Sequence, residues 1–237
     1  MRARYPDREG AVDRDGVNVA FEVYGRDGPA ILFVPASPIS HARSWKGMIP
    51  FLSRHTTVIA TDGRGTHRSD RPHRRDCYSP DEVDADLVAV LDAAGATNAV
   101  VVAHCHASSW AMRLADEHAD RVAGLVLVAP ALAVAPGYEY AADAEQRWQD
   151  DIGDACGWSM RNRAFWRTDG GYRAWVEFFF DQQLPEPHST KQLEDTVTWA
   201  LDTEVEAMIA EREGRAPFGA ADAEELCRRV QERQPVL

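Results

Sequence analysis

One segment, residues 98–110 with the sequence NAVVVAHCHASSW, predicts a strand, a tight turn and a helix in immediate succession. The apolar run at 100–102 is typical of a buried strand, and apolar residues at helical spacing, among them Trp110 and Leu114, follow at once. Cys105 stands at the turn. A nucleophile there would lie above the sheet, where N–H groups at the helix N-terminus stabilise a thiolate and a developing oxyanion. The segment therefore predicts a thiol site at Cys105, with a buried small apolar residue as the alternative.

Strands and helices alternate along the first half of the chain. The pair Asp15-Gly16 favours a hairpin turn and predicts two short strands within 10–24. Alternation at short spacing then predicts an α/β fold, with a mainly parallel sheet and helices on both faces. Apart from the strand before Cys105, strands are expected at 30–36, 56–61 and 124–128, and helices at 40–54 and from residue 80.

The pattern changes after residue 136, where aromatic residues and helical periodicity continue without a convincing strand. Such a stretch indicates a helical insertion. Helices are predicted at 139–155, 171–183, 190–213 and 219–233. The expected domains are a core at 1–136, a helical cap at 137–217, and a C-terminal part at 218–237 that returns to the core.

Composition excludes several classes of protein. The formal net charge is −12, and Asp70 and Pro72 interrupt the basic run at 68–75, so no nucleic-acid partner is expected. The four cysteines lack paired short spacing, which argues against a disulfide framework and indicates a reducing, cytoplasmic location. No apolar run approaches the roughly 18–20 residues of a membrane helix, and the N-terminus lacks the apolar centre of a signal peptide.

Four motifs in chain order resemble those of the α/β-hydrolase superfamily, over about residues 18–136. The small-x-nucleophile-x-small form of 103–107 is similar to the family's nucleophile elbow. The other three are VPASP at 34–38, in place of the strand-end histidine-glycine loop, DGRGTHRSD at 62–70, similar to D-x-R-G-x-G-x-S-D, and DRVAGLVL at 120–127. The cap segment 178–191 is similar to a bacterial branch of these hydrolases.

The resemblance implies roles for particular residues. Cys105 would be the nucleophile, as in the dienelactone-hydrolase branch, and the backbone N–H groups of Ser37 and His106 would form the oxyanion hole. Asp62 and Arg64 would hold the loop that follows their strand. No cofactor is implied, and no metal is expected at 104–106, because adjacent side chains at such a turn point in different directions.

The chain departs from the family at several positions. Alanine stands at 36, 103 and 107, where the family has glycine. The family's acid and histidine follow strands beyond the cap, and the chain is expected to be truncated before them, since 235–237 (PVL) resembles the start of the first. No residue then matches the acid or the histidine. The C-terminal strands would be missing, and the exposed sheet edge would favour self-association.

The predicted activity is hydrolysis of an ester, thioester or related small carbonyl compound through Cys105. The expected partner is a small-molecule substrate, with no membrane partner. His188 is either a pocket residue of the cap or an ordinary helix-start residue. Two other functions stay open, because no base is identifiable. The chain would be a catalytically inactive fragment, or a non-catalytic ligand-binding module on the same fold.

Overall fold

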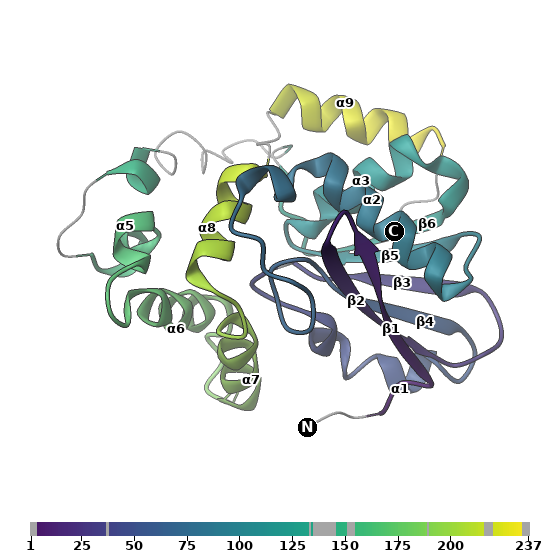
Figure 1. The fold of residues 1–237 in the computed structure, drawn as a ribbon, viewed down its shortest axis with the longest axis horizontal. Coiled ribbons are helices and arrows are strands. Elements are labelled where there is room, and N and C mark those ends of the chain that lie inside the picture. Colours follow the sequence, from purple (N-terminus) through teal and green to yellow (C-terminus); the bar gives the residue numbers. More distant parts are fainter. Residues whose placement is uncertain are drawn as a thin grey trace.

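A six-stranded sheet forms the centre of the computed structural model (Figure 1). The structure describes residues 4–36, 38–132, 134, 146–150, 155–188, 190–215 and 220–233. The strands are β1 Arg8–Arg14, β2 Val17–Tyr24, β3 Ala30–Val34, β4 Thr57–Asp62, β5 Ala99–His104 and β6 Val122–Val128, in the order β1-β2-β4-β3-β5-β6. Antiparallel pairing joins β1 to β2 and β2 to β4. The strands β4, β3, β5 and β6 run parallel to one another. The predicted α/β fold is therefore confirmed.

The hairpin of β1 and β2 forms where the turn pair predicts it. Asp15 and Gly16 both have positive φ, 53° and 82°, as a two-residue turn between twisted strands requires. The Gly16 N–H also donates to Asp13 Oδ1 at 2.8 Å. β6 is the outer strand on the other side of the sheet within the described residues. Self-association through that edge stays a prediction.

Helices cover both faces of the sheet, as the alternation predicts. On one face lie α2 Pro80–Ala94 and α3 Ala107–Glu117, with α9 Ala220–Gln231 stacked on α3, and on the other lies the short α1 Ile49–Leu52 (Figure 1). Successive residues of β3 serve the two cores in turn. Leu32 and Val34 pack on the α2–α3 side, and Phe33 stacks on Trp45 on the opposite side, with ring centroids 4.5 Å apart.

A partly buried ion pair joins α2 to α3. Arg113 Nε donates to Asp84 Oδ2 at 3.0 Å, and the same guanidinium reaches the exposed Asp81 at 2.7 Å. Burial raises the pKa of Asp84 from 3.8 to about 6, and the neighbouring arginine opposes this only in part. Asp84 is therefore a site at which folding depends on pH.

Two predicted helices are interrupted in the structure. The segment 40–54 contains a 3₁₀ turn, Ala42–Trp45, and then the four-residue α1, with Pro50 in its first turn. Proline fits there because it lacks the N–H that a helix interior needs. The segment 190–213 forms α7 Thr190–Ala200 and α8 Val205–Gly214 instead of one helix. Between them, Thr203 pairs with Thr66 of the core, and this pairing takes the place of helical hydrogen bonds.

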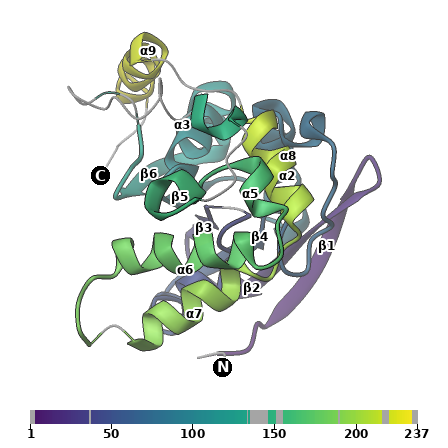
Figure 2. The same cartoon turned by 90° about the vertical axis from the view of Figure 1, so that its left-hand side faces the viewer.

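The cap helices are held together by an aromatic cluster of their own. They comprise α5 Arg163–Trp166, α6 Gly171–Gln183, α7 and α8, which gather on one side of the sheet (Figure 2). Trp148, Trp166 and Trp175 are buried among them. α6 matches the predicted 171–183, and α9 lies within the predicted 219–233. Most of the predicted helix 139–155, and the domain boundaries at 136 and 217, lie outside the described residues. No helix of the described ranges is long and apolar enough to span a membrane.

Candidate functional site

The turn between β5 and α3 holds Cys105 in a backbone conformation that residues other than glycine rarely adopt. Its φ is +56°, in the left-handed region that is uncommon for residues other than glycine. Three hydrogen bonds fix this geometry. The Cys105 N–H donates to Val128 O, and its carbonyl accepts from Ser108 N and Ala131 N, each at 3.1 Å. Strain that persists because its surroundings fix it is often found at functional sites.

Small residues on both sides of Cys105 allow this sharp turn. Ala103 and Ala107 are both 0% exposed, and each packs into the core between the sheet and the helices α2 and α3. Between them, Cys105 is only partly buried. The chain thus reverses within a few residues while Cys105 keeps partial exposure to solvent. The structure therefore contains the strand, the turn and the helix that the sequence predicts around Cys105.

His106 immediately precedes the first residue of α3. Its ring packs edge-on against Trp110, with centroids 4.9 Å apart, and its carbonyl accepts from Ser109 Oγ at 2.7 Å. Its backbone N–H belongs to the first turn of the helix, where N–H groups carry partial positive charge. The expected role as an oxyanion donor stays a prediction.

The loop after β3 lies next to this turn, because β3 and β5 are neighbouring parallel strands. Val34 and Ala103 are register partners near the ends of the two strands. Ala36 is buried and its carbonyl accepts from Ser40 N at 3.1 Å. Ser37 itself, the expected second oxyanion donor, lies outside the described residues.

His188 is exposed in the segment between α6 and α7. Neither the surface hollow between α2 and α3 nor the small cavity at the ends of β3 and β4 includes it among its lining residues. The pocket role of this histidine therefore stays a prediction.

Asp62 and Arg64 hold loops together, as expected. Asp62 is fully buried and accepts from Ala42 N at 3.0 Å and from Arg68 Nε at 2.9 Å. Arg64 makes a bidentate pair with Asp86 of α2, at 2.6 and 2.5 Å. These contacts fix the chain after β4 against both α2 and the loop after β3.

A small cavity lies beside the carboxyl ends of β3 and β4. Pro35, Gly63 and Trp110 line it together with Glu211 of α8. Its volume of about 30 Å³ gives room for about one water molecule. Burial raises the pKa of Glu211, while Arg215, 3.6 Å from its Oε1, acts in the opposite direction. The cap thus places a buried carboxyl close to the loop that follows β3.

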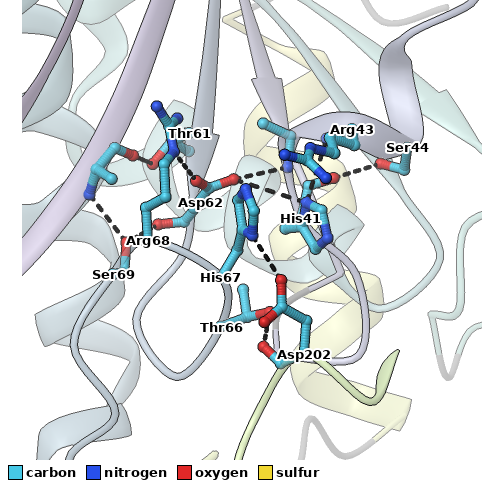
Figure 3. Close-up of polar contacts among 12 residues, drawn as sticks. His41, Arg43, Ser44, Thr61, Asp62, Thr66, His67, Arg68, Ser69 and Asp202 are labelled. Atoms are coloured by element: carbon cyan, nitrogen blue, oxygen red, sulfur yellow. Dashed lines mark hydrogen bonds and ion pairs between the residues drawn. The ribbon is translucent and has the colours of Figure 1, made fainter. Parts of the chain in front are cut away.

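Sequence reasoning missed a second cluster, which joins the core to the cap (Figure 3). His41 follows β3, His67 follows β4, and Asp202 lies between α7 and α8. The two imidazoles stack with centroids 4.3 Å apart and planes at 12°, and His67 Nδ1 lies 2.5 Å from Asp202 Oδ2. His41 is fully buried, with its Nδ1 3.9 Å from Asp62 Oδ1. Burial, followed by the neighbouring His67, lowers the pKa of His41 to about 3.

One sequence signal could have pointed to this cluster. His67 occupies the second glycine position of the D-x-R-G-x-G-x-S-D pattern, and its φ is +49°. Histidine is one of the residues that enter the left-handed region more readily than most. Asp202 is 135 positions away in the chain, so no local spacing could have linked it to His67.

The strand order and the strand-turn-helix at Cys105 agree with a known family. A family model for the α/β hydrolase fold matches residues 29–197. The chain belongs to the α/β hydrolase fold family. The enol-lactonase of Burkholderia xenovorans has a TM-score of 0.71 and 17% identity, over 96% of this chain and 79% of its own. At that identity the likeness shows the fold alone.

Relatives with curated names match part of the α/β hydrolase chain. Epoxide hydrolase A of Mycobacterium tuberculosis is 35% identical over 126 residues, which are 52% of this chain and 39% of its own. The non-heme chloroperoxidase of Streptomyces lividans is 37% identical over 120 residues, 48% of this chain and 41% of its own. The matches thus span about two fifths of these relatives, and the two names describe different reactions. Fold membership alone therefore does not select an activity.

Proposed function

We propose that this α/β hydrolase cleaves an ester, thioester or related small carbonyl compound through Cys105. The strained left-handed turn at Cys105 carries the proposal. It is the position at which this fold presents its nucleophile above the sheet. A thiol needs less activation than a hydroxyl there, since thiolate forms close to neutral pH and is strongly nucleophilic.

In the proposed reaction, the Cys105 thiolate attacks the carbonyl carbon of the substrate. The new oxyanion would accept hydrogen bonds from the N–H groups of His106 and Ser37. Collapse of this tetrahedral species breaks the bond to the alkoxide or thiolate leaving group, which takes up a proton, and leaves an acyl thioester on Cys105. Water then attacks the thioester, releases the acid and returns the thiol. The second step depends on a positioned base, so acylation is expected to be faster than turnover.

The test is intact-mass analysis and peptide mapping after brief exposure to p-nitrophenyl acetate. We expect one acetyl group per chain, located on Cys105, with a burst of about one equivalent of p-nitrophenolate and slow or absent turnover after it. Cys105→Ala is expected to abolish the burst. Cys227→Ser serves as a matched control, because this thiol is also partly buried but lies on α9.

Two outcomes would contradict the proposal. One is acetylation spread over Cys77, Cys156 and Cys227 at rates similar to that of Cys105. The other is an unchanged burst in Cys105→Ala. Sustained turnover that is lost in Cys105→Ala would support the nucleophile and show that these residues include a base, and His188→Ala would then be the first variant to assay.

A further inference from the structure

We propose that His41, His67 and Asp202 form a binding site for a divalent transition-metal ion such as Zn²⁺, which would tie the cap to the core. One ligand atom from each residue lies within 4.8 Å of the others. Two imidazoles and one carboxylate are donors that zinc accepts, and three protein ligands leave a fourth position for water. The site is separate from the thiol chemistry proposed for Cys105.

Buried nitrogen atoms without partners give the second argument. The Nε2 atoms of both His41 and His67 are buried and lack a hydrogen-bond partner within the described residues. Buried polar atoms are nearly always satisfied, so such a pair calls for an explanation. Asp202 contacts His67 at Nδ1, so a cation held by all three residues would satisfy both Nε2 atoms only after the ring of His67 turns. Two stacked apolar rings would fill the same space and would leave no nitrogen atom without a hydrogen-bond partner.

The charges around the cluster come from two carboxylates and three guanidiniums. Asp62 and Asp202 bring negative charge, which Arg68 and Arg71 oppose from 2.9 Å and 3.6 Å respectively. These two ion pairs balance each other and Arg43 adds one positive charge near His41, so the ion would be held by its bonds to the imidazoles and the carboxylate and not by net negative charge.

Binding would require a small rearrangement of the rings. Ligand atoms around tetrahedral zinc are roughly 3.3 Å apart, given zinc–nitrogen distances of about 2.0–2.1 Å. The present separations reach 4.8 Å, and the two ring planes are nearly parallel. One ring must therefore turn so that both nitrogens face the ion. His67 is the candidate for this movement, because its partner Asp202 is partly exposed while His41 is enclosed.

The position of the site suggests what the ion would do. His41 and His67 lie on loops after neighbouring strands of the core, and Asp202 lies where the cap chain turns back at the break between α7 and α8. The contacts already present there include the backbone hydrogen bond from His67 N to Asp202 O, the side-chain contacts of Asp202 with His67 and Arg71, and the pairing of Thr66 with Thr203. An ion would add coordination bonds across the same junction and stabilise the cap in this position.

The experiment is equilibrium dialysis of tag-free protein against Zn²⁺, with thermal unfolding measured with and without the ion. We expect one Zn²⁺ per chain and a higher Tm when it is bound. His67→Asn and Asp202→Asn should each weaken binding at least tenfold and remove the Tm increase. Asparagine is used at 67 because it tolerates positive φ. His73→Asn is the matched control, since His73 forms a similar pair with Glu204 at 2.7 Å but is half exposed and outside the cluster.

Co²⁺ absorption distinguishes this site from the cysteines. Imidazole and carboxylate ligands are expected to give only weak visible bands, whereas thiolate ligands add strong near-ultraviolet absorption. Three outcomes would overturn the proposal: no Zn²⁺ binding by the wild-type chain, equal binding by the wild type and both site variants, or a thiolate band with Co²⁺. Far-ultraviolet circular dichroism shows whether each variant is folded, so that a loss of folding is not mistaken for a loss of binding.

Discussion

Replacement of Cys105 by glycine is expected to give a more stable protein than its replacement by alanine, although glycine usually has the opposite effect. Both variants remove the same sulfur atom, so their difference reflects the backbone and the single Cβ methyl group of alanine. The left-handed conformation, with φ at +56° here, costs a residue other than glycine about 1–2 kcal/mol. Glycine costs a folded chain roughly 0.5–1 kcal/mol relative to alanine, because its unfolded state has more freedom. The difference favours Cys105→Gly by up to about 1.5 kcal/mol, with a mid-range value of about 0.75 kcal/mol.

The assay is urea unfolding followed by circular dichroism, with free energies of unfolding taken from the midpoint and slope. Ala107→Gly is the control. Ala107 is the first residue of α3 and is fully buried, so glycine there should destabilise the protein by about 1 kcal/mol. We therefore expect glycine to give a more stable protein than alanine at position 105 and a less stable one at position 107. If Cys105→Gly were less stable than Cys105→Ala by a similar amount, the turn would not be strained, and the main support for a nucleophile at this position would be lost.

Two further predictions concern buried charges. Asp84→Asn should gain stability relative to the wild type as pH rises from about 4 to about 6, because the raised pKa means that ionisation of Asp84 costs the folded state, by at most about 3 kcal/mol. Urea midpoints of variant and wild type at pH 4 and pH 7 measure this gain. For the exposed control Asp81→Asn, the difference from the wild type should be the same at both pH values. The same result for Asp84→Asn would contradict the argument. Arg64→Met should lose about 3–5 kcal/mol, because it leaves Asp86 buried without its bidentate partner. The exposed Arg74→Met should lose nothing measurable, and similar losses for both would refute the argument.

The parts of the fold that could be predicted are those fixed by neighbours in sequence. The Asp15-Gly16 turn, the alternating strands and the strand-turn-helix at Cys105 each depend on a few adjacent residues. The interrupted helices could not be predicted in the same way. Residues 190–213 have helical periodicity throughout, yet Thr203 and Asp202 bond to the core loop after β4. Tertiary contacts there outweigh helix propensity, which differs between ordinary residues by no more than about 0.7 kcal/mol per position.

The candidate sites differ in how far sequence reasoning could reach them. Cys105 was accessible because its turn, its small neighbours and its helix are contiguous. The cluster of His41, His67 and Asp202 was not, because its third member comes from the cap and joins the others only through the fold. The prediction of no metal at 104–106, made from the directions of adjacent side chains at one turn, could not test donors that are brought together by separate loops.

Positive φ links the two sites by a single physical argument. The described residues other than glycine with positive φ are Asp15, His67, Cys105 and Ala129. Asp15 is explained by its hairpin, and Ala129 carries no reactive group, so a strained backbone alone marks no site. At Cys105 and His67, glycine would fit the backbone better, yet each position carries a side chain with nucleophilic or metal-binding chemistry. Both lie at carboxyl ends of parallel strands, where open α/β sheets bind their ligands. The cost of keeping a thiol and an imidazole there is what the two proposed functions would explain.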